Sequence, residues 1–278
     1  MTAPAHAAAE PFFLPTPHGE RFCLYHRPAG ACRGAVLYVH PFAEEMNKSR
    51  RMAALQARAL AAAGFGVLLL DLQGCGDSDG DFGEARWEHW KIDLASARAW
   101  LLAREDKPVS LLGLRLGALL ALDYARTALP ALERIVLWQP VLQGAAFLTQ
   151  FLRLRVAGDM LGDGGAAGGT RQLRAQLAAG QALEVAGYEL APQLAAAIDA
   201  LDASRLPPFQ PVDWFEIVAS DERPIPPAAE RSAASWAEGG AAPAMHKIVG
   251  DAFWSTQEIA ECPALVAATC AVLAGKKA

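Results

Sequence analysis

The sequence predicts an α/β fold in which a mostly parallel central sheet is covered by helices on both faces. Short runs of apolar and β-branched residues alternate along the 278-residue chain with longer segments that have helical periodicity. The apolar runs lack the polar positions of a strand with one wet face, so both faces of the sheet should be buried. A chain of this length can bury a sizeable core in one domain and still carry an insertion.

The predicted elements follow one another in a regular order. Two extended segments come first, over residues 11–14 and 20–27. Buried strands are expected over residues 34–40, 65–71, 108–112, 134–138 and 213–219, with a last strand that includes 247–249. Helices are expected over residues 49–63, 86–104, 118–127, 228–237 and 255–273. In such a fold, ligands bind beyond the carboxyl ends of the strands, so the residues that follow each strand deserve the closest inspection.

Residues 139–211 break this alternation. The segment is rich in Ala, Leu and Arg, has helical periodicity, and contains a cluster of glycines between residues 158 and 169. We predict that it forms a helical cap with a mobile loop, inserted between two parts of the α/β core at 1–138 and 212–278.

Composition and charge limit the classes of protein to which the chain can belong. Hydrophobic residues make up 53% and charged residues 20%, which excludes a disordered or fibrous chain. The net charge of -5 and the lack of a basic block argue against a nucleic-acid partner. Five cysteines without a CxxC pair favour a reducing compartment, and neither a signal peptide nor a membrane-spanning run is expected. The sequence therefore predicts a soluble cytoplasmic protein.

Four segments at the predicted carboxyl edge of the sheet carry a resemblance to a known family. His40-Pro41, the segment DLQGCGDS at 71–78 and the segment GLRLG at 113–117 follow successive strands, and Asp221 follows a later one. They resemble the α/β-hydrolase superfamily over almost the whole chain. More narrowly, HPFAEEMNKSRRM, GLRLGA and GDAFW resemble the exosortase A system-associated hydrolases, of the type called hydrolase 2. This resemblance implies an α/β-hydrolase fold and a gene neighbourhood of exopolysaccharide and protein-sorting genes.

The catalytic triad that the resemblance implies is incomplete. A nucleophile elbow has the pattern G-x-S-x-G, but Arg115 stands at its centre, and a permanently charged guanidinium cannot act as a nucleophile. Asp221 matches the place of the triad acid, whereas Phe253 or Trp254 stands where the family has its histidine. His246 begins the same strand and should lie about 10 Å or more from the active edge. Two of the three triad groups are therefore missing.

Three roles are open for Arg115. It could pair with Asp221, Glu44 or Glu45 and fill the former site with an ion pair. Alternatively, it could bind the carboxylate, phosphate or sulfate of a ligand under the cap, where a helix N-terminus already favours an anion. A third role is to stabilise an oxyanion formed by another nucleophile.

The remaining candidates surround this position. His40 could shape the turn after its strand or touch a ligand, and the loop carboxylates Glu44 and Glu45 could hold Arg115 or do acid–base work if burial raised a pKa. Cys75 with His40 would be the best substitute dyad, although no third orienting group is evident. We assign Arg115 and Asp221 to a degenerate catalytic site, and as ligand-binding residues we predict His40, Glu44, Glu45, Cys75, Ser78, Leu116 and Phe253.

Neither a metal ion nor an organic cofactor is expected. The acidic run at 77–81 resembles a calcium loop, but Phe82 occupies the position that requires glycine, and a strand rather than a helix precedes it. Gly74 and Gly76 follow a strand as in a dinucleotide-binding loop, but the third glycine is missing and aspartates come next.

Two classes of function remain. The first is an accessory protein of an exopolysaccharide or export system that binds a small-molecule, acyl or sugar ligand, and that could also bind a protein partner. The second is a hydrolase of an ester, thioester or acyl-sugar with a non-standard site around Arg115, Asp221, Glu44 and Glu45. The family resemblance favours the second, but it rests on the fold, and a fold alone does not determine a function. The residues at the triad positions favour the first.

Overall fold

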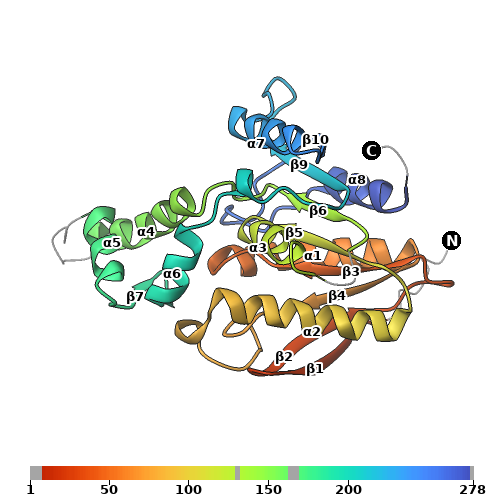
Figure 1. Cartoon of the computed structure of the whole chain (residues 1–278), viewed down its shortest axis with the longest axis horizontal. Coiled ribbons are helices and arrows are strands. Elements are labelled where there is room, and N and C mark those ends of the chain that lie inside the picture. Colours follow the sequence, from red (N-terminus) through yellow and green to blue (C-terminus); the bar gives the residue numbers. More distant parts are fainter. Residues whose placement is uncertain (1–7, 129–131, 162–168, 276–278) are drawn as a thin grey trace.

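The computed structural model describes residues 8–128, 132–161 and 169–275, and it is built on one eight-stranded sheet (Figure 1). The strand order is β1-β2-β4-β3-β5-β6-β9-β10. The pairs β1–β2 and β2–β4 are antiparallel, and every other pair in this sheet is parallel. The predicted mostly parallel sheet is therefore confirmed.

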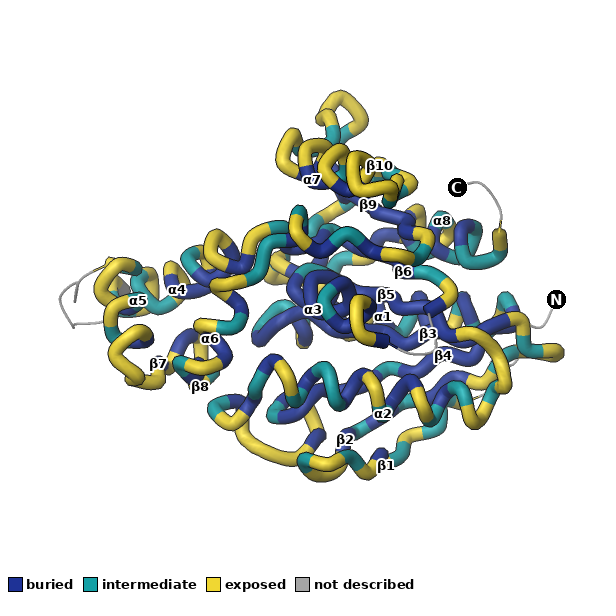
Figure 2. The backbone as a smooth tube through the Cα atoms, in the orientation of Figure 1, coloured by how far each residue is buried: buried dark blue, intermediate teal, exposed yellow. Residues whose placement is uncertain are grey.

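The strands match the apolar runs of the sequence. Their bounds are β1 Glu10–Thr16, β2 Gly19–His26, β3 Gly34–Val39, β4 Phe65–Leu70, β5 Val109–Leu114, β6 Ile135–Trp138, β9 Val212–Val218 and β10 Ala244–Val249. All residues of β3, β5, β6 and β9 are buried, whereas the outer strands β1 and β10 are partly exposed (Figure 2). Because central strands lose water from both faces, a continuous apolar run is what such a position requires.

Helices cover both faces of the sheet. The first face carries α1 (Glu44–Ala62) and α8 (Pro263–Leu273), whose buried side chains form one core cluster with β3, β4 and β6. The second face carries α2 (Trp87–Glu105), α3 (Leu116–Ala125) and α7 (Pro227–Glu238), which contribute to a second cluster. Both layers that the sequence predicts are present.

The segment between β6 and β9 lies to one side of the sheet (Figure 1). Its elements are α4 Gly144–Leu161, α5 Thr170–Ala178, β7 Leu183–Val185, β8 Tyr188–Leu190, α6 Pro192–Asp199 and the short 3-10 helix η2 Ala203–Arg205. The predicted cap is mainly helical, but β7 and β8 form a hairpin that the sequence did not indicate. The predicted mobile glycine loop falls on 162–168, outside the described residues, and the division into core and cap domains stays a prediction.

Two helices begin five or more residues away from their predicted starts, and one of these differences moves candidate residues. The first helix begins at Glu44 rather than near residue 49, so Glu44 and Glu45 lie in its first turn and not in a loop. Carboxylates are favoured there because the helix dipole is positive at its N-terminus. The last helix begins at Pro263 instead of residue 255, since proline fits the first helical turn and breaks a preceding one.

A fully buried ion pair joins three elements beneath the carboxyl edge of the sheet. Arg21 on β2 donates from Nε to Asp93 on α2 at 2.8 Å, and both side chains have no exposed surface. The same carboxylate accepts the backbone N–H of Gln73, in the loop after β4, at 2.9 Å. The pair therefore fixes that loop against α2.

Replacing Arg21 by methionine should destabilise the fold strongly. The change keeps most of the apolar stem but leaves Asp93 as a buried charge without its cation, which costs about 3–5 kcal/mol. Urea unfolding followed by circular dichroism measures the loss. Arg27→Met is the control, because its ion pair with Glu10 is exposed, and its loss should stay below about 1 kcal/mol. Equal losses in the two variants would contradict this role of the buried pair.

Candidate functional site

The turn between β5 and α3 has the geometry of a strained elbow. Arg115 lies between the last residue of β5 and the first of α3. Its backbone has φ 56° and ψ -118°, a conformation that residues other than glycine rarely adopt. Its N–H donates to the carbonyl of Trp138 at 3.0 Å, and its carbonyl accepts from Ala118 and Val141 at 3.1 Å each. These backbone bonds hold the strained residue in place.

The two glycines of the elbow are required by close approach. A Cβ on Gly113 would lie 2.5 Å from the Cα of Ala118, and a Cβ on Gly117 would lie 2.3 Å from the carbonyl oxygen of His40. Neither distance is possible for a real side chain without movement of backbone. The sequence pattern therefore preserves the turn although its central residue has changed.

Arg115 is held between a carboxylate and an aromatic ring. Its Nε donates to Glu45 in the first turn of α1 at 3.1 Å, and the two side chains are only 15% and 12% exposed. Its guanidinium carbon lies 5.5 Å from the ring centroid of Trp254, within cation–π range. Among the described residues, none accepts a hydrogen bond from either terminal nitrogen.

Of the two aromatic residues at the expected histidine position, the structure brings Trp254 to the elbow. Phe253, the residue that the sequence analysis chose, is fully buried and packs edge-on against Trp138 at 6.2 Å. Its ring lies in the core between the sheet and α8. The aromatic residue that borders the guanidinium of Arg115 is therefore Trp254 and not Phe253.

Glu44 and Glu45 lie partly buried beside Arg115. Each has one carboxylate oxygen that is buried and finds no hydrogen-bond partner among the described residues. Burial raises the pKa of Glu44. Burial also raises the pKa of Glu45, although the charge and hydrogen bond of Arg115 oppose the rise. The predicted pairing of Arg115 with one of these residues is present, and it is Glu45 that makes it.

The structure does not bring Asp221 into this cluster. Its side chain is 84% exposed, and Lys247 donates to its carboxylate at 2.8 Å and to its carbonyl at 2.6 Å. These bonds from Lys247 lower the pKa of Asp221. His246 forms a hydrogen bond with Asp213, near the start of β9, at 2.8 Å. Neither Asp221 nor His246 therefore reaches the elbow.

His40 has both ring nitrogens engaged by backbone. Its Nε2 accepts the N–H of Leu72 at 3.2 Å, and its Nδ1 lies 2.7 Å from the carbonyl oxygen of Pro41. Because a carbonyl only accepts, Nδ1 must carry the proton, and the ring is neutral. Burial lowers the pKa of His40, which favours the same form. The structural role that the sequence analysis weighed for His40 fits these bonds.

Cys75 and Ser78 are both buried, and the hydroxyl of Ser78 is engaged in hydrogen bonds. Burial raises the pKa of the Cys75 thiol, so the reactive thiolate is disfavoured. Ser78 donates to the carbonyl of Asp71 at 2.6 Å and accepts the N–H of Phe22 at 2.9 Å. Neither side chain therefore offers a nucleophile to the elbow.

The space on the α2 side of the elbow is closed. It is lined by His40, Cys75, Leu116 and several aromatic side chains, and its free volume of about 10 Å³ is barely that of one water molecule. Phe42 fills it, in edge-on contact with Phe82 at 5.2 Å and with Phe151 of α4 at 5.0 Å. Three residues predicted to bind a ligand thus surround a filled space.

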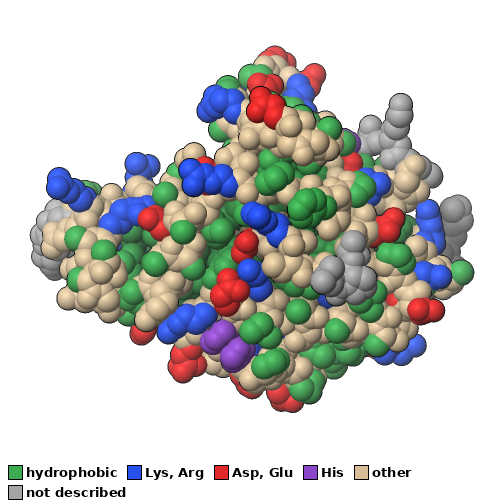
Figure 3. All heavy atoms as spheres, in the orientation of Figure 1, with side chains coloured by type: hydrophobic (Ala, Val, Ile, Leu, Met, Phe, Trp, Pro, Cys, Tyr) green, Lys and Arg blue, Asp and Glu red, His purple; other side chains and the backbone are tan. Residues whose placement is uncertain are grey.

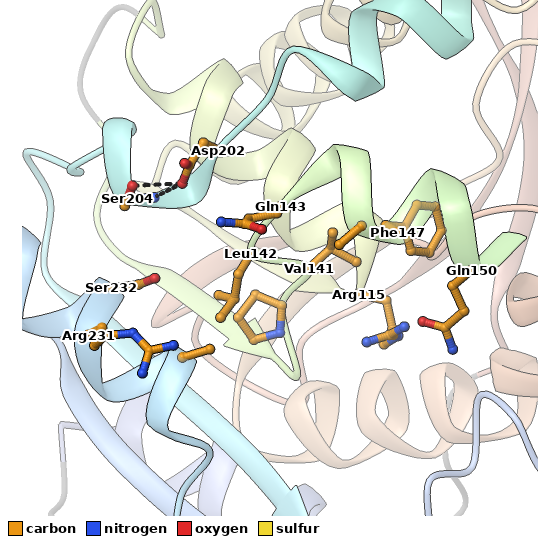
Figure 4. Close-up of a pocket in the computed structure, with 13 residues that line it drawn as sticks. Arg115, Val141, Leu142, Gln143, Phe147, Gln150, Asp202, Ser204, Arg231 and Ser232 are labelled. Atoms are coloured by element: carbon orange, nitrogen blue, oxygen red, sulfur yellow. Dashed lines mark hydrogen bonds between the residues drawn. The ribbon is translucent and has the colours of Figure 1, made fainter. Parts of the chain in front are cut away.

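An open cavity lies on the other side of Arg115 (Figure 4). Its volume is about 470 Å³, within the range of small-molecule sites. It is bounded by the loop after β6, by α4, by η2 and by α7. Its lining residues are Arg115, Pro140, Val141, Leu142, Gln143, Ala146, Phe147, Gln150, Asp202, Ser204, Ala228, Arg231 and Ser232.

The sequence analysis missed most of this cavity. Arg115 is the one predicted site residue that lines it. Gln150 in α4 and Arg231 in α7 come from predicted helices, but helical periodicity does not show that the two helices converge. The place of residues 139–211 beside the carboxyl edge was the one available signal.

The described residues hold no group of three His, Cys, Asp or Glu side chains arranged to bind a metal ion. No helix in the described part of the chain is long and apolar enough to cross a lipid bilayer. Basic and acidic side chains are interspersed on the face drawn in Figure 3, without a broad basic patch of the kind that binds nucleic acid.

Comparisons with known proteins agree with this architecture. Residues 30–178, more than half of the 278-residue chain, match the family described as Serine aminopeptidase, S33. No curated protein matches the sequence.

Solved structures give the fold. Est1E from Butyrivibrio proteoclasticus with bound ferulic acid aligns with a TM-score of 0.71 and 13% identity, over 95% of this chain and 98% of its own. A thermostable carboxyl esterase from Bacillus coagulans aligns with 0.64 and 14%, over 97% and 99%. Proline iminopeptidase from Mycobacterium smegmatis aligns with 0.62 and 15%, over 96% and 98%. The chain has the α/β-hydrolase fold, as predicted.

Replacing Arg115 by methionine should destabilise the protein in a pH-dependent way. The pKa of Glu45 is raised in the folded protein. Its ionised form therefore lowers the stability at high pH, and this cost disappears below the pKa of an unfolded glutamate, about 4.3. Loss of Arg115 enlarges this cost. We expect a loss on the order of 2–3 kcal/mol at pH 8 that shrinks toward pH 4.5, measured by urea unfolding.

Arg51→Met is the matched control. Arg51 lies on α1, the helix that carries Glu45, and its ion pair with Glu261 is largely exposed. Replacing Arg51 should therefore lower the free energy of unfolding only slightly at both pH values. A loss in Arg115→Met that does not depend on pH would contradict the coupling of Arg115 to Glu45.

Proposed function

We propose that this chain, which belongs to the serine aminopeptidase S33 family, binds a small anionic or acyl ligand at Arg115 without serine-hydrolase turnover. One observation carries the proposal. Arg115 takes the central position of the elbow, is held through Nε by Glu45, and lines the 470 Å³ cavity.

The hydrogen-bond donors that the guanidinium of Arg115 leaves unused support anion binding. Glu45 accepts the hydrogen bond from Nε, and the guanidinium lies over the ring of Trp254, so the Arg115 side chain is oriented from two sides. The terminal nitrogens keep their donors for a ligand. A guanidinium offers paired donors whose spacing matches a carboxylate or phosphate, which makes such contacts strong and directional.

The surroundings strengthen the interaction. The helices α1 and α3 both begin beside the elbow, at Glu44 and Leu116, and the positive ends of their dipoles favour an anion there. Glu45 offsets part of this field, but water screens the interaction of an anion with Arg115 only weakly, because the Arg115 side chain is 15% exposed.

The ion pair also supports a more modest role for Arg115. In that role the pair with Glu45 only fills the former nucleophile site, and no ligand binds. Both roles share the contact at 3.1 Å, but they differ in the cavity, since a filler needs no open space of 470 Å³ beside it.

A hydrolase with a non-standard site is the second candidate. Burial raises the pKa of both Glu44 and Glu45, and such paired carboxylates near a fixed cation can act as a general acid and base. In this mechanism Arg115 would stabilise an oxyanion formed on an ester, thioester or acyl-sugar by attack of water. Asp221, which the sequence analysis included in this site, would act only if its loop moved.

The biological setting follows from the sequence resemblance. The segments that resemble exosortase A system-associated hydrolases support a proposed setting in the cytoplasm, beside an exopolysaccharide or protein-export system. Ligand binding there would serve sensing or delivery, and a protein partner of that system would respond to the occupied site.

Serine-hydrolase assays should be negative. We expect no turnover of p-nitrophenyl butyrate or acyl-CoA and no labelling by a fluorophosphonate probe, since no serine stands at the elbow. Arg115→Ser should stay inactive as well, because Trp254 rather than a histidine faces that position. A serine esterase serves as the positive control. Turnover that disappears in Arg115→Met would favour the second candidate.

Anion binding should depend on Arg115. Hexanoate carries one carboxylate on a short apolar chain, and isothermal calorimetry at low salt should detect its binding to the unaltered protein. Arg115→Met should weaken it about tenfold or more, the value of one charge-assisted contact. Arg171→Met removes an exposed arginine of α5 outside the cavity and should bind as tightly as the unaltered protein. Absence of hexanoate binding would leave the filler role.

A further inference from the structure

The cavity beside Arg115 contains a second arginine. Arg231 projects from α7, and Figure 4 shows its guanidinium directed toward the loop that carries Leu142, with Arg115 and Gln150 beyond that loop. The two arginines come from positions far apart in the sequence. They meet the same cavity because α7 packs beside η2 and the loop after β6.

Arg231 has no anionic partner among the described residues, and its side chain is exposed at the cavity. One carboxylate lines the same space, that of Asp202, and it accepts from the backbone N–H of Ser204 at 2.9 Å and from its hydroxyl at 2.6 Å. Asp202 is thus engaged with its own turn. Arg231 is therefore the one cation of the cavity lining that no carboxylate of the described residues pairs with, since Arg115 is held by Glu45.

The wall between the arginines is mainly apolar. Pro140, Val141, Leu142 and Phe147 lie along it, with the side-chain amides of Gln143 and Gln150 beside them. On the opposite side of the elbow the space is filled by Phe42. A ligand whose anionic end meets Arg115 therefore extends toward α7 and Arg231.

We infer that the site takes a ligand with two anionic groups joined by an apolar segment, the inner group on Arg115 and the outer group on Arg231. An α,ω-dicarboxylate is the simplest member of this class. The inference rests on the proposed anion binding at Arg115 and adds a second anchor, which fixes the length and chemistry of the ligand.

The two contacts differ in strength. Arg115 is mostly buried, so its contact with an anion is screened little by solvent. Arg231 is exposed, so its contact should add only about fivefold in affinity and should weaken as salt is raised. Selectivity for a given spacer length follows because both contacts form only when the ligand spans the wall.

Matched pairs of acids test the inference. Calorimetry at low salt would compare the dicarboxylates from butanedioate to decanedioate with monocarboxylates of the same carbon number. The full chain would be titrated unaltered and as Arg115→Met, Arg231→Met and Arg171→Met. We expect one spacer length to bind about fivefold tighter than its monocarboxylate. In Arg231→Met the dicarboxylate should lose this advantage over its monocarboxylate, and Arg171→Met should behave as the unaltered protein.

The possible failures are distinguishable. If monocarboxylates bind through Arg115 but no dicarboxylate gains affinity, or if the gain survives in Arg231→Met, the second anchor is wrong and anion binding at Arg115 stands. If neither class binds to the unaltered protein, both the inference and the proposed function fail. A dicarboxylate affinity that falls in Arg231→Met no more than the monocarboxylate affinity would mean that Arg231 only shapes the cavity, which also overturns the inference.

Discussion

The contact between Arg115 and Glu45 is the interaction on which the rest of the site depends. It joins the elbow after β5 to the first turn of α1, and it orients a cation at a position with φ 56°. Strain of this kind persists only when surrounding bonds determine it, and here three backbone hydrogen bonds do so. The turn that presents a nucleophile in a serine hydrolase presents a fixed charge in this chain.

The neighbouring residues determine which sides of that charge are open. Trp254 lies within cation–π range of the guanidinium, and Phe42 lies in the closed space on the α2 side. What stays open is the cavity toward α7. The proposed anion binding needs no proton relay, only an oriented cation that borders an open space.

The sequence predicted the strands and the elbow well, because buried strands and tight turns impose local residue patterns. It placed Glu44 and Glu45 in a loop, since Ala43 before them offers no side-chain cap to mark a helix start. It chose Phe253 over Trp254, because one residue of register decides which ring faces the elbow. Arg231 was missed entirely: its role depends on how α7 packs against distant segments, which no local pattern encodes.

A crystal structure with hexanoate bound tests most directly whether Arg115 has become an anion-binding group. The carboxylate should lie within hydrogen-bonding distance of the terminal nitrogens of Arg115, with Nε still on Glu45 and the alkyl chain along Leu142 and Phe147. A carboxylate bound elsewhere, or an Arg115 side chain whose terminal nitrogens turn away from the cavity, would contradict it.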